Sequence, residues 1–345
     1  MDKYEHGGDV YRNDNILHDF SVNTNARGMP EEVKKALIDR VAEFSRYPDP
    51  QCSRLRRAIA LREGVDEEHI VCGNGAADLI YRLVYSLKPK SALIPAPTFS
   101  EYERALSQID CSIDYHQLTP DNGFFLSDTI LERIDRHTDV VFLCHPNNPT
   151  GRLIERSIID GILEKCRQTG TIVIVDECFI DFTDGFSTTD YLEQMPHLVV
   201  LKAFTKSYAL AGLRLGYMMS TNTSLIEKVM SSAQCWSVSV PAQIAGETAV
   251  TLDKWLTETR RETAVERAFL RQALLNLGLT VFPSDANYLL VESDVPLYEP
   301  LLRVGILIRR CENFRGLNQR YFRFAVKTKR ENERLIAALL DILKR

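Results

Sequence analysis

Residues 139–179 read DVVFLCHPNNPTGRLIERSIIDGILEKCRQTGTIVIVDECF, and this stretch decides the fold. It opens with a short apolar run at 139–146, continues into an amphipathic segment around 157–170, and closes with a second apolar run at 171–177. Two apolar runs of strand length on either side of a helical pattern predict a strand–helix–strand unit. Because successive positions in both runs are apolar, we expect a parallel sheet with helices on both faces.

The same alternation continues on both sides of this stretch. Further strands are predicted at 69–73, 91–97 and 197–204, and a helix at 76–87. This pattern is typical of an α/β protein with a mainly parallel sheet flanked by helices. Beyond about residue 245, charged helices precede short strands and a last amphipathic helix, which predicts a smaller α+β domain. We expect an N-terminal arm, a large domain and a small C-terminal domain, at residues 1–28, 29–245 and 246–345.

Composition excludes several classes of function. The chain has 345 residues, 45% of them hydrophobic, and a net charge of −5, so nothing attracts it as a whole to nucleic acid or to anionic membranes. Its eight cysteines form no C-x-x-C pair, and no cluster of His, Cys and Asp has the spacing of a metal site. The first residues contain no apolar signal-peptide core, and no apolar run has the length of a membrane span. We expect a cytoplasmic protein with reduced thiols, no membrane or nucleic-acid partner and no metal.

Polar segments follow five of the predicted strands. They are GNGAAD (73–78), PTFSEY (97–102), HPNNPTG (145–151), DECF (176–179) and FTKS (204–207). In open α/β sheets, ligands bind outside the carboxyl ends of the strands. We therefore expect the five segments to face one crevice.

The residue types in these segments suit one kind of cofactor. A lysine of lowered pKa, here Lys206, is the usual nucleophile for a carbonyl group, and Arg214 offers a planar fork for phosphate. Free N–H groups at the start of the helix, from Ala76 and Ala77, also suit phosphate. Asp176 ends a buried strand and needs a cation or an N–H as partner. An aldehyde, a phosphate and a protonatable ring nitrogen are combined in pyridoxal phosphate.

The order and spacing of the motifs resemble those of the fold-type I pyridoxal-phosphate enzymes, in the aminotransferase class I/II group. The motifs are RYPDP (46–50), GNGAAD, PTFSEY, PNNPTG (146–151), VDECF (175–179) and TKSYALAGLRLGY (205–217). The resemblance implies that Lys206 binds the aldehyde of the cofactor, that Asp176 pairs with the ring nitrogen, and that Asn148 bonds O3′. It further implies that Phe99 stacks on the ring. The expected phosphate ligands are Ala76, Ala77, Thr205 and Arg214, with Tyr47 from a neighbouring subunit, which implies a homodimer with shared active sites.

Within this group the chain looks closer to the L-threonine O-3-phosphate decarboxylases of cobalamin biosynthesis than to the histidinol-phosphate aminotransferases. The similar segments are HGGD (6–9), DFSVNTN (19–25), CWSVSVPA (235–242) and the region ILIRRCENFRGL…RYFRFAVK. The resemblance implies a substrate site made of His6, Gly7, Asn23, Asn148, Arg309 and Arg323. Arg323 matches the arginine that binds the α-carboxylate in the wider family.

Phe179 favours the decarboxylase. Aminotransferases of this type usually have tyrosine at this position, where the phenol donates a hydrogen bond to O3′ of the cofactor, and the decarboxylases resemble this chain in having phenylalanine. We therefore expect decarboxylation of O-phospho-L-threonine to aminopropanol phosphate. The alternative is amino transfer between histidinol phosphate, or a related amine or amino acid, and 2-oxoglutarate, because Lys206 would handle the proton in both reactions.

Two readings from other classes compete with an enzyme of this kind. A non-catalytic member of the family would bind ligand only, but Lys206, Asp176 and Arg214 are all intact. A nicotinamide-binding protein would need G-x-G-x-x-G after the first strand, which this sequence does not have.

Overall fold

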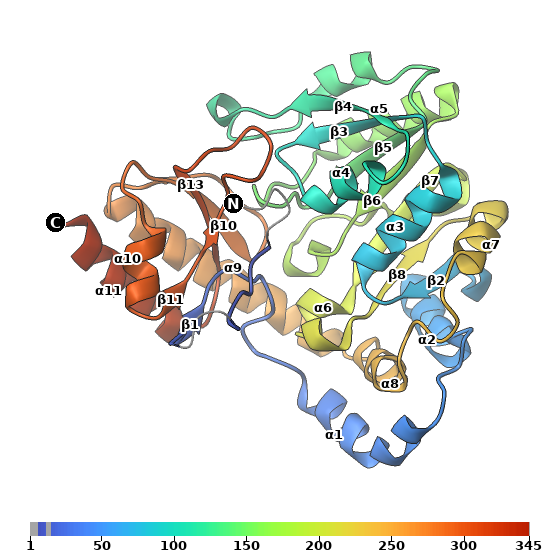
Figure 1. Ribbon diagram of the computed structural model, residues 1–345, viewed down its shortest axis with the longest axis horizontal. Coiled ribbons are helices and arrows are strands. Elements are labelled where there is room, and N and C mark those ends of the chain that lie inside the picture. The colour runs from blue at the N-terminus through green and yellow to red at the C-terminus, as the bar shows by residue number, and fades with distance from the viewer. Residues whose placement is uncertain (1–5, 12–14, 345) are drawn as a thin grey trace.

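Two β-sheets organise the computed structural model, which describes residues 6–11 and 15–344 (Figure 1). The larger sheet has seven strands, and the smaller has four. In spatial order the larger sheet consists of β2 (Ile70–Gly73), β8 (Gly216–Met219), β7 (Leu198–Ala203), β6 (Ile172–Asp176), β5 (Val140–Cys144), β3 (Ser91–Ala96) and β4 (Ser112–Gln117).

The larger sheet is mainly parallel, as predicted. Neighbouring strands from β7 to β4 pair in parallel, whereas β8 is antiparallel to both β7 and β2. Consequently β2 runs in the same direction as β7, and the five strands with polar segments all end at the same edge. The sequence analysis missed β4 and β8. β4 lies at the edge of the sheet with half of its side chains exposed, so it lacks the apolar run of a central strand.

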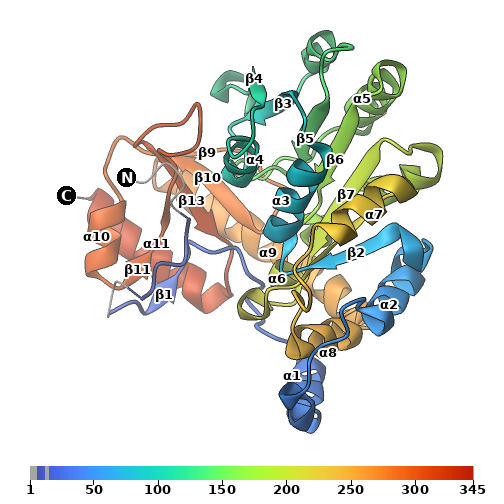
Figure 2. The ribbon, with the colours of Figure 1, turned by 45° about the vertical axis from the view of Figure 1, so that its right-hand side comes forward.

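Helices cover both faces of this sheet because its strands are apolar on both sides (Figure 2). In β6, Val173 and Val175 belong to one apolar cluster, while Ile174 belongs to another on the opposite face. The first cluster includes side chains of α2 (Ser53–Glu63), α5 (Arg156–Thr169) and α8 (Val240–Ala249). The second includes side chains of α3 (Ala76–Leu87), α4 (Ser100–Leu106) and α7 (Thr223–Ser231).

The smaller sheet is antiparallel and has its own apolar core. Its strands are β12 (Arg309–Arg310), β13 (Tyr321–Ala325), β10 (Tyr288–Glu292) and β9 (Thr280–Val281), in that order. Leu289 and Val291 of this sheet pack with side chains of two long helices, α9 (Asp253–Asn276) and α11 (Lys329–Leu343). Figure 1 shows this unit, with α10 (Tyr298–Arg303), beside the larger sheet and containing the C-terminal end of the chain.

The N-terminal arm lies against the smaller sheet unit, although it is far from it in sequence. Strand β1 (His18–Asp19) pairs in parallel with β11 (Ile306–Leu307), and the chain then reaches α1 (Glu31–Asp39), which packs on α8. The expected domain boundary after residue 245 falls inside α8. The connection from the larger to the smaller sheet runs through α8 and α9.

Within residues 6–11 and 15–344, no helix has both the length and the apolar character needed to cross a membrane. The cytoplasmic location expected from the sequence stays a prediction.

Candidate active site

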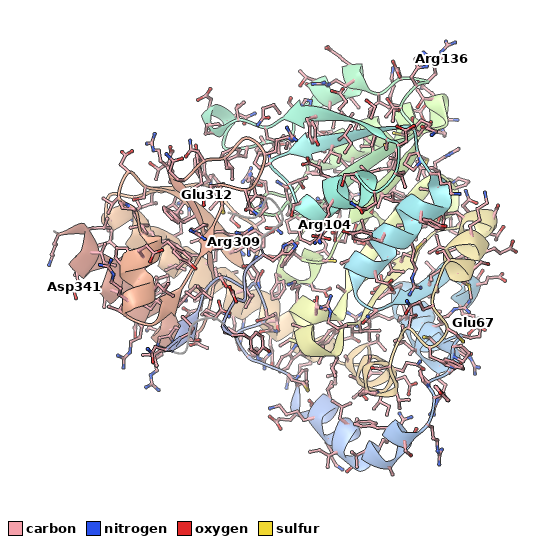
Figure 3. All side chains as sticks on the ribbon, viewed as in Figure 1. Glu67, Arg104, Arg136, Arg309, Glu312 and Asp341 are labelled. Carbon is pink, nitrogen blue, oxygen red and sulfur yellow. The ribbon has the colours of Figure 1, made fainter. Side chains whose placement is uncertain are left out.

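The residues expected to bind cofactor and substrate gather around one cavity of about 450 Å³. It lies where the carboxyl ends of the larger sheet face the arm and the smaller sheet. Figure 3 shows the region between Arg104 of α4 and Arg309 of β12, both of which line the cavity. The expected residues that line it are His6, Gly7, Asn23, Ala76, Ala77, Phe99, Asn148, Asp176, Thr205, Lys206, Arg214, Arg309 and Arg323, together with Phe179.

Lys206 lies in α6 (Phe204–Ser207), the short helix that directly follows β7. Burial, together with the positive charges of Arg323 and Arg214, lowers the pKa of its ammonium group to about 8, against the opposing effect of Cys178 and Asp176. The Nζ atom lies 5.7 Å from the centre of the Phe179 ring. Such a lysine is neutral far more often at physiological pH than a solvated one, as a nucleophile for an aldehyde must be.

Asp176 is the last residue of β6 and is 4% exposed. Its Oδ2 accepts a hydrogen bond from the hydroxyl of Tyr102 (2.7 Å), and its Oδ1 accepts one from the backbone N–H of Cys178 (3.0 Å). These two donors offset the cost of burying the carboxylate and fix its orientation. The sequence analysis missed Tyr102, although it follows Phe99 by three residues in PTFSEY, which is the spacing of neighbours on a helical turn.

The two asparagines of the PNNPTG segment make different contacts. Asn147 ties this loop to the segment that follows β3, because its side chain donates to Pro97 O (2.9 Å) and accepts from Thr98 Oγ1 (2.6 Å). Asn148 instead lines the cavity, and its Oδ1 accepts a hydrogen bond from Arg323. His145 is fully buried, and its Nδ1 accepts a hydrogen bond from the backbone N–H of Ile154 (3.0 Å), so it supports the same loop.

A cradle for an anionic group lies at the start of α3. Gly75, with a φ of +88°, precedes the helix, and a Cβ at this position would lie 2.7 Å from Nη2 of Arg214. A Cβ at Gly216 would lie 2.5 Å from the backbone nitrogen of Ala76. Both glycines therefore allow the helix start and the guanidinium to approach each other. N–H groups and a guanidinium around one space form a typical phosphate site.

Arg323 joins the two sides of the cavity. Its guanidinium donates to Asn148 from the larger domain and to the backbone oxygen of Ser21 (2.8 Å). When the oxygen and nitrogen of the Asn23 amide are exchanged, both atoms gain hydrogen-bond partners. In this orientation the Asn23 oxygen accepts from Nε (3.3 Å) and Nη1 (3.2 Å) of Arg323. Burial, together with the positive charge of Arg309, lowers the pKa of Arg323 to about 10. Such a fork, buried next to further cations, suits a substrate carboxylate.

The structure distinguishes the adjacent arginines of β12. Arg309 is 4% exposed and lines the cavity, and its Nη2 donates to Oδ1 of Asn313 (2.8 Å). Arg310 points to the other side of the strand, where its guanidinium lies 4.4 Å from the centre of the Tyr298 ring. This alternation is that of any β-strand. It places Arg309 where the family resemblance predicted a substrate ligand.

Asn25 was missed in the sequence, although it closes the quoted segment DFSVNTN. Its backbone N–H donates to Lys206 O (3.0 Å), and its Nδ2 donates to Ser207 O (2.8 Å) and to Thr259 Oγ1 (2.8 Å). The residue thus holds the backbone that carries Lys206 against α9. Only the fold reveals this role, because 182 positions separate Asn25 from Ser207.

Tyr47 does not line this cavity. Its side chain is 77% exposed and stacks on Trp236, with the ring centres 4.3 Å apart. Within a single chain, Tyr47 therefore lies apart from the other expected cofactor ligands.

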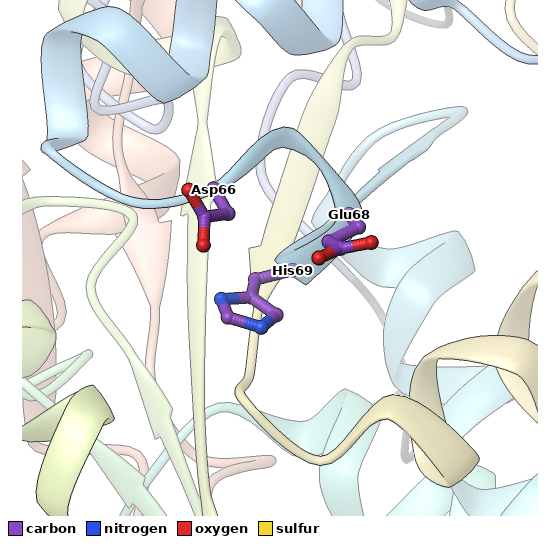
Figure 4. Close-up of side chains that lie close together, drawn as sticks. All are labelled: Asp66, Glu68 and His69. Carbon is purple, nitrogen blue, oxygen red and sulfur yellow. The ribbon is translucent and has the colours of Figure 1, made fainter.

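A possible metal site appears elsewhere among the described residues. Asp66, Glu68 and His69 each bring one ligand atom to within 4.8 Å of the others (Figure 4). These three residues are close in sequence, and the turn at η2 (Glu67–His69) directs their side chains toward one another. This group was not among the features predicted from the sequence. Asp66 and Glu68 are exposed, and exposed acidic groups are common without an ion. We assign no metal to them.

The arrangement fits pyridoxal phosphate. A nucleophilic amine, a doubly hydrogen-bonded carboxylate and an anion cradle line one cavity, as an aldehyde, a ring nitrogen and a phosphate on one molecule would require. Phe99 lines the same cavity and offers an aromatic face.

Known proteins resemble this chain over nearly its whole length. Residues 15–339 match the family described as aminotransferase class I and II. The threonine-phosphate decarboxylase of Salmonella typhimurium is 40% identical over 352 aligned positions, which cover 98% of this chain and 96% of that protein.

Two solved structures show the same fold. The histidinol-phosphate aminotransferase of Clostridium acetobutylicum matches with a TM-score of 0.89 and 28% identity, over 95% of this chain and 99% of that chain. The L-threonine-O-3-phosphate decarboxylase of Porphyromonas gingivalis matches with a TM-score of 0.85 and 26% identity, over 95% of this chain and 100% of that chain. The predicted architecture, that of the fold-type I enzymes, is confirmed. The chain therefore belongs to the aminotransferase class I and II family.

Proposed function

We propose that this chain is a pyridoxal-phosphate enzyme that decarboxylates O-phospho-L-threonine to aminopropanol phosphate. The observation that carries the proposal is the distribution of cations in one cavity. Arg214 lies at the anion cradle beside α3, whereas Arg309, Arg323 and His6 lie on the wall formed by the arm and the smaller sheet. Two separate cationic regions suit a phosphorylated cofactor at one end and a phosphorylated amino acid at the other.

Apart from Tyr47, the residues expected to bind the cofactor line the cavity. Lys206 would bind the aldehyde, Asp176 the ring nitrogen and Asn148 the ring hydroxyl O3′, with Phe99 stacked on the ring. Ala76, Ala77, Thr205 and Arg214 would hold the phosphate. When bound, pyridoxal phosphate supplies an electron sink for the bond that breaks at the substrate Cα.

The protein's own residues orient the substrate and move the proton. Arg323 would hold the α-carboxylate, and Arg309, His6, Gly7 and Asn23 would hold the substrate phosphate. As CO₂ leaves, a proton must reach Cα, and Nζ of Lys206 would deliver it. A pKa of about 8 lets this group both hold and release a proton near neutral pH.

The similarity to the Salmonella enzyme and the identity of residue 179 favour decarboxylation. Phe179 is buried and packs edge-on against Tyr288, with ring centres 5.1 Å apart, so this position offers no hydroxyl to the cofactor. The likeness to the Clostridium acetobutylicum structure supports the second candidate, which is amino transfer with histidinol phosphate and 2-oxoglutarate. In that reaction Lys206 would remove a proton from Cα instead.

The deciding experiment uses purified protein loaded with pyridoxal phosphate and O-phospho-L-threonine, without a keto acid. Steady CO₂ release over many turnovers is expected. Turnover that requires both histidinol phosphate and 2-oxoglutarate, with no CO₂ release, would instead establish the aminotransferase. Lys206→Ala serves as the inactive control in both assays.

We propose in addition that the active enzyme is a homodimer in which Tyr47 completes the partner's phosphate site. Tyr47 and Trp236 form an exposed aromatic pair, and the nearby segment that includes η1 (Val41–Ser45) exposes further apolar side chains. The exposed ones are Ile38 (71%), Val41 (58%) and Phe44 (40%). Exposed apolar patches of this kind are typical of protein interfaces.

Subunit complementation tests the shared site. Lys206→Ala and Tyr47→Ala chains, each impaired alone, are mixed under conditions that exchange subunits. A mixed dimer contains one site with both residues intact, so roughly a quarter of all sites should regain activity. Failure to regain any activity in a verified mixed dimer would contradict a role for Tyr47 across the interface.

A further inference from the structure

Glu101 is a buried carboxylate in the wall of the cavity, outside the set of expected ligands. It lies on α4 and is 6% exposed. Its Oε1 lies 2.7 Å from Nε2 of His6 and 3.4 Å from Nη1 of Arg104, and its Oε2 accepts from the hydroxyl of Tyr81 (3.1 Å). Burial acts to raise the pKa of this carboxyl, but the contacts with His6, Tyr81 and Arg104 outweigh it, so the pKa lies below its usual value.

His6 is the member of this pair that belongs to the N-terminal arm. Its side chain is 44% exposed, and its ring also faces Phe99, with ring centres 5.8 Å apart. The pair thus connects a surface segment to a buried carboxylate of the larger domain. Because 95 positions separate the two residues, this contact fixes where the arm lies.

The next residues of the arm are held on the opposite side. A Cβ at Gly7 would lie 2.3 Å from Ser21 O, and the N–H of Gly8 donates to Ser21 Oγ (2.8 Å). Ser21 O also accepts from Arg323, so the arm passes directly beside the expected carboxylate ligand. The arm therefore spans the cavity from Arg323 to α4.

The chemistry of the imidazole gives this contact a consequence for binding. A neutral His6 whose Nε2–H donates to Glu101 would leave Nδ1 as an acceptor, which disfavours a phosphate oxygen. With Nε2–H directed at Glu101, a donor for a phosphate oxygen has to be Nδ1–H, so both ring nitrogens carry a proton when such a ligand is bound. Glu101 can thus hold the ring in place and leave Nδ1 to an anionic ligand.

We propose that Glu101 is a positioning residue that holds the N-terminal arm over the cavity through His6, so that His6 donates to the phosphate group of the substrate. This role rests on the proposed function, because it assumes a phosphorylated substrate. Glu101 acts through His6 and does not itself contact the substrate.

Steady-state kinetics of the cofactor-loaded enzyme with O-phospho-L-threonine test the role in binding. Glu101→Gln removes the charge and keeps the shape, and it should raise KM about tenfold with kcat changed less than twofold. His6→Ala should raise KM to a similar extent, and the double variant should be no worse than either single variant. A wild-type KM for Glu101→Gln, or effects that multiply in the double variant, would overturn the proposal.

Hydrogen exchange gives a readout that does not depend on turnover. In the cofactor-loaded enzyme without substrate, Glu101→Gln should accelerate exchange at the arm amides, including that of Gly8, and leave α4 unchanged. Equal acceleration in α4 would show a structural role, and unchanged arm exchange would show that Glu101 does not hold the arm. If the wild type fails to act on O-phospho-L-threonine, the proposed function fails, whereas the exchange result still decides the positioning role.

Glu103→Gln is the matched control. Glu103 lies on the same helix and pairs with Arg315 of the smaller domain (3.0 Å). This variant also removes a paired carboxylate from α4, so it should keep the arm exchange and the KM of the wild type. A Glu103→Gln variant that matched Glu101→Gln in both assays would attribute the effect to α4 in general.

Discussion

The two walls of the cavity are built in different ways. On one wall, Lys206, Asp176 and Asn148 each lie at or just after the end of a strand of the same sheet, so the sheet brings them together. On the other wall, Arg323 and the arm are positioned by contacts between distant segments. Arg323 and Ser21, for example, are 302 positions apart.

The difference indicates how each wall responds to change. Loss of one side chain on the first wall leaves the sheet, and therefore the other ligands, in place. On the second wall each contact also orders a segment, so a single substitution is expected to disturb neighbouring ligands as well. The first wall should determine cofactor chemistry, and the second should determine substrate affinity.

Lys206→Ala should have the largest effect, because it removes the nucleophile of the first wall. We expect loss of the absorbance band of covalently bound cofactor and a fall in turnover of about 10²–10⁴-fold or more. Absorbance spectra and CO₂ release measure the two effects, with the exposed Lys228→Ala as control. An active Lys206→Ala enzyme would refute the assignment of the first wall.

Arg323→Ala breaks the second wall. The charged hydrogen bonds of Arg323 are each worth about 1.5–3 kcal/mol, so KM should rise roughly 10–150-fold for each bond to substrate that is lost. The absorbance band of covalently bound cofactor should persist, unlike in Lys206→Ala, which separates the two walls. Arg323→Lys should recover only part of the affinity, because lysine lacks the planar fork. Unaltered substrate binding in Arg323→Ala would show that another residue holds the carboxylate.

Tyr102→Phe tests whether the hydrogen bond from Tyr102 supports Asp176 on the first wall. It removes the donor to Asp176 Oδ2 and leaves a buried carboxylate oxygen without that bond, at a cost of about 1.5–3 kcal/mol. We expect a lower kcat and a lower melting temperature, with KM nearly unchanged. A change confined to KM would mean that Tyr102 supports the substrate wall instead.

The pH dependence of stability reports on Lys206 in the cofactor-free protein. Its pKa is about 8 in the folded chain, compared with an ordinary value of 10.5. Between these values the unfolded chain binds more protons, so the free energy of unfolding should rise with pH across this range. Below about pH 8 the amine is protonated in both states, and the penalty of burying its charge persists in full. Urea unfolding from about pH 7 to about pH 10 measures how the free energy of unfolding changes with pH in the wild type and in Lys206→Met. The same pH dependence in both proteins would contradict the lowered pKa of Lys206.

Phe179→Tyr should have the smallest effect on activity. It tests whether a residue of the first wall influences the choice between decarboxylation and amino transfer. A phenol at this position would donate to O3′ of the cofactor, which favours the deprotonated form of the bound chromophore. The spectral titration of the loaded enzyme should therefore move to lower pH. An unchanged titration would remove Phe179 from the arguments for decarboxylation.

Much of the first wall could be predicted from the sequence, because each of its residues lies next to a strand in a recognisable motif. The parallel order of β7, β6 and β5 follows from alternating strands and helices, and it places Lys206 and Asp176 at one edge. Tyr102 was missed because a hydrogen bond across 74 positions leaves no local pattern. Asn25 was missed for the same reason.

The sequence by itself determined the fold class and the family, and it predicted which residues would hold a phosphorylated aldehyde, because strand and helix periodicity and motif spacing are local properties of the chain. Only the tertiary structure decided that Arg323 connects Asn148 to Ser21, that Asn25 holds the backbone of Lys206, and that Glu101 meets His6. These pairings depend on how two sheets and an arm pack against one another. That packing is set by burial and hydrogen bonding summed over distant segments, which no short stretch of sequence contains.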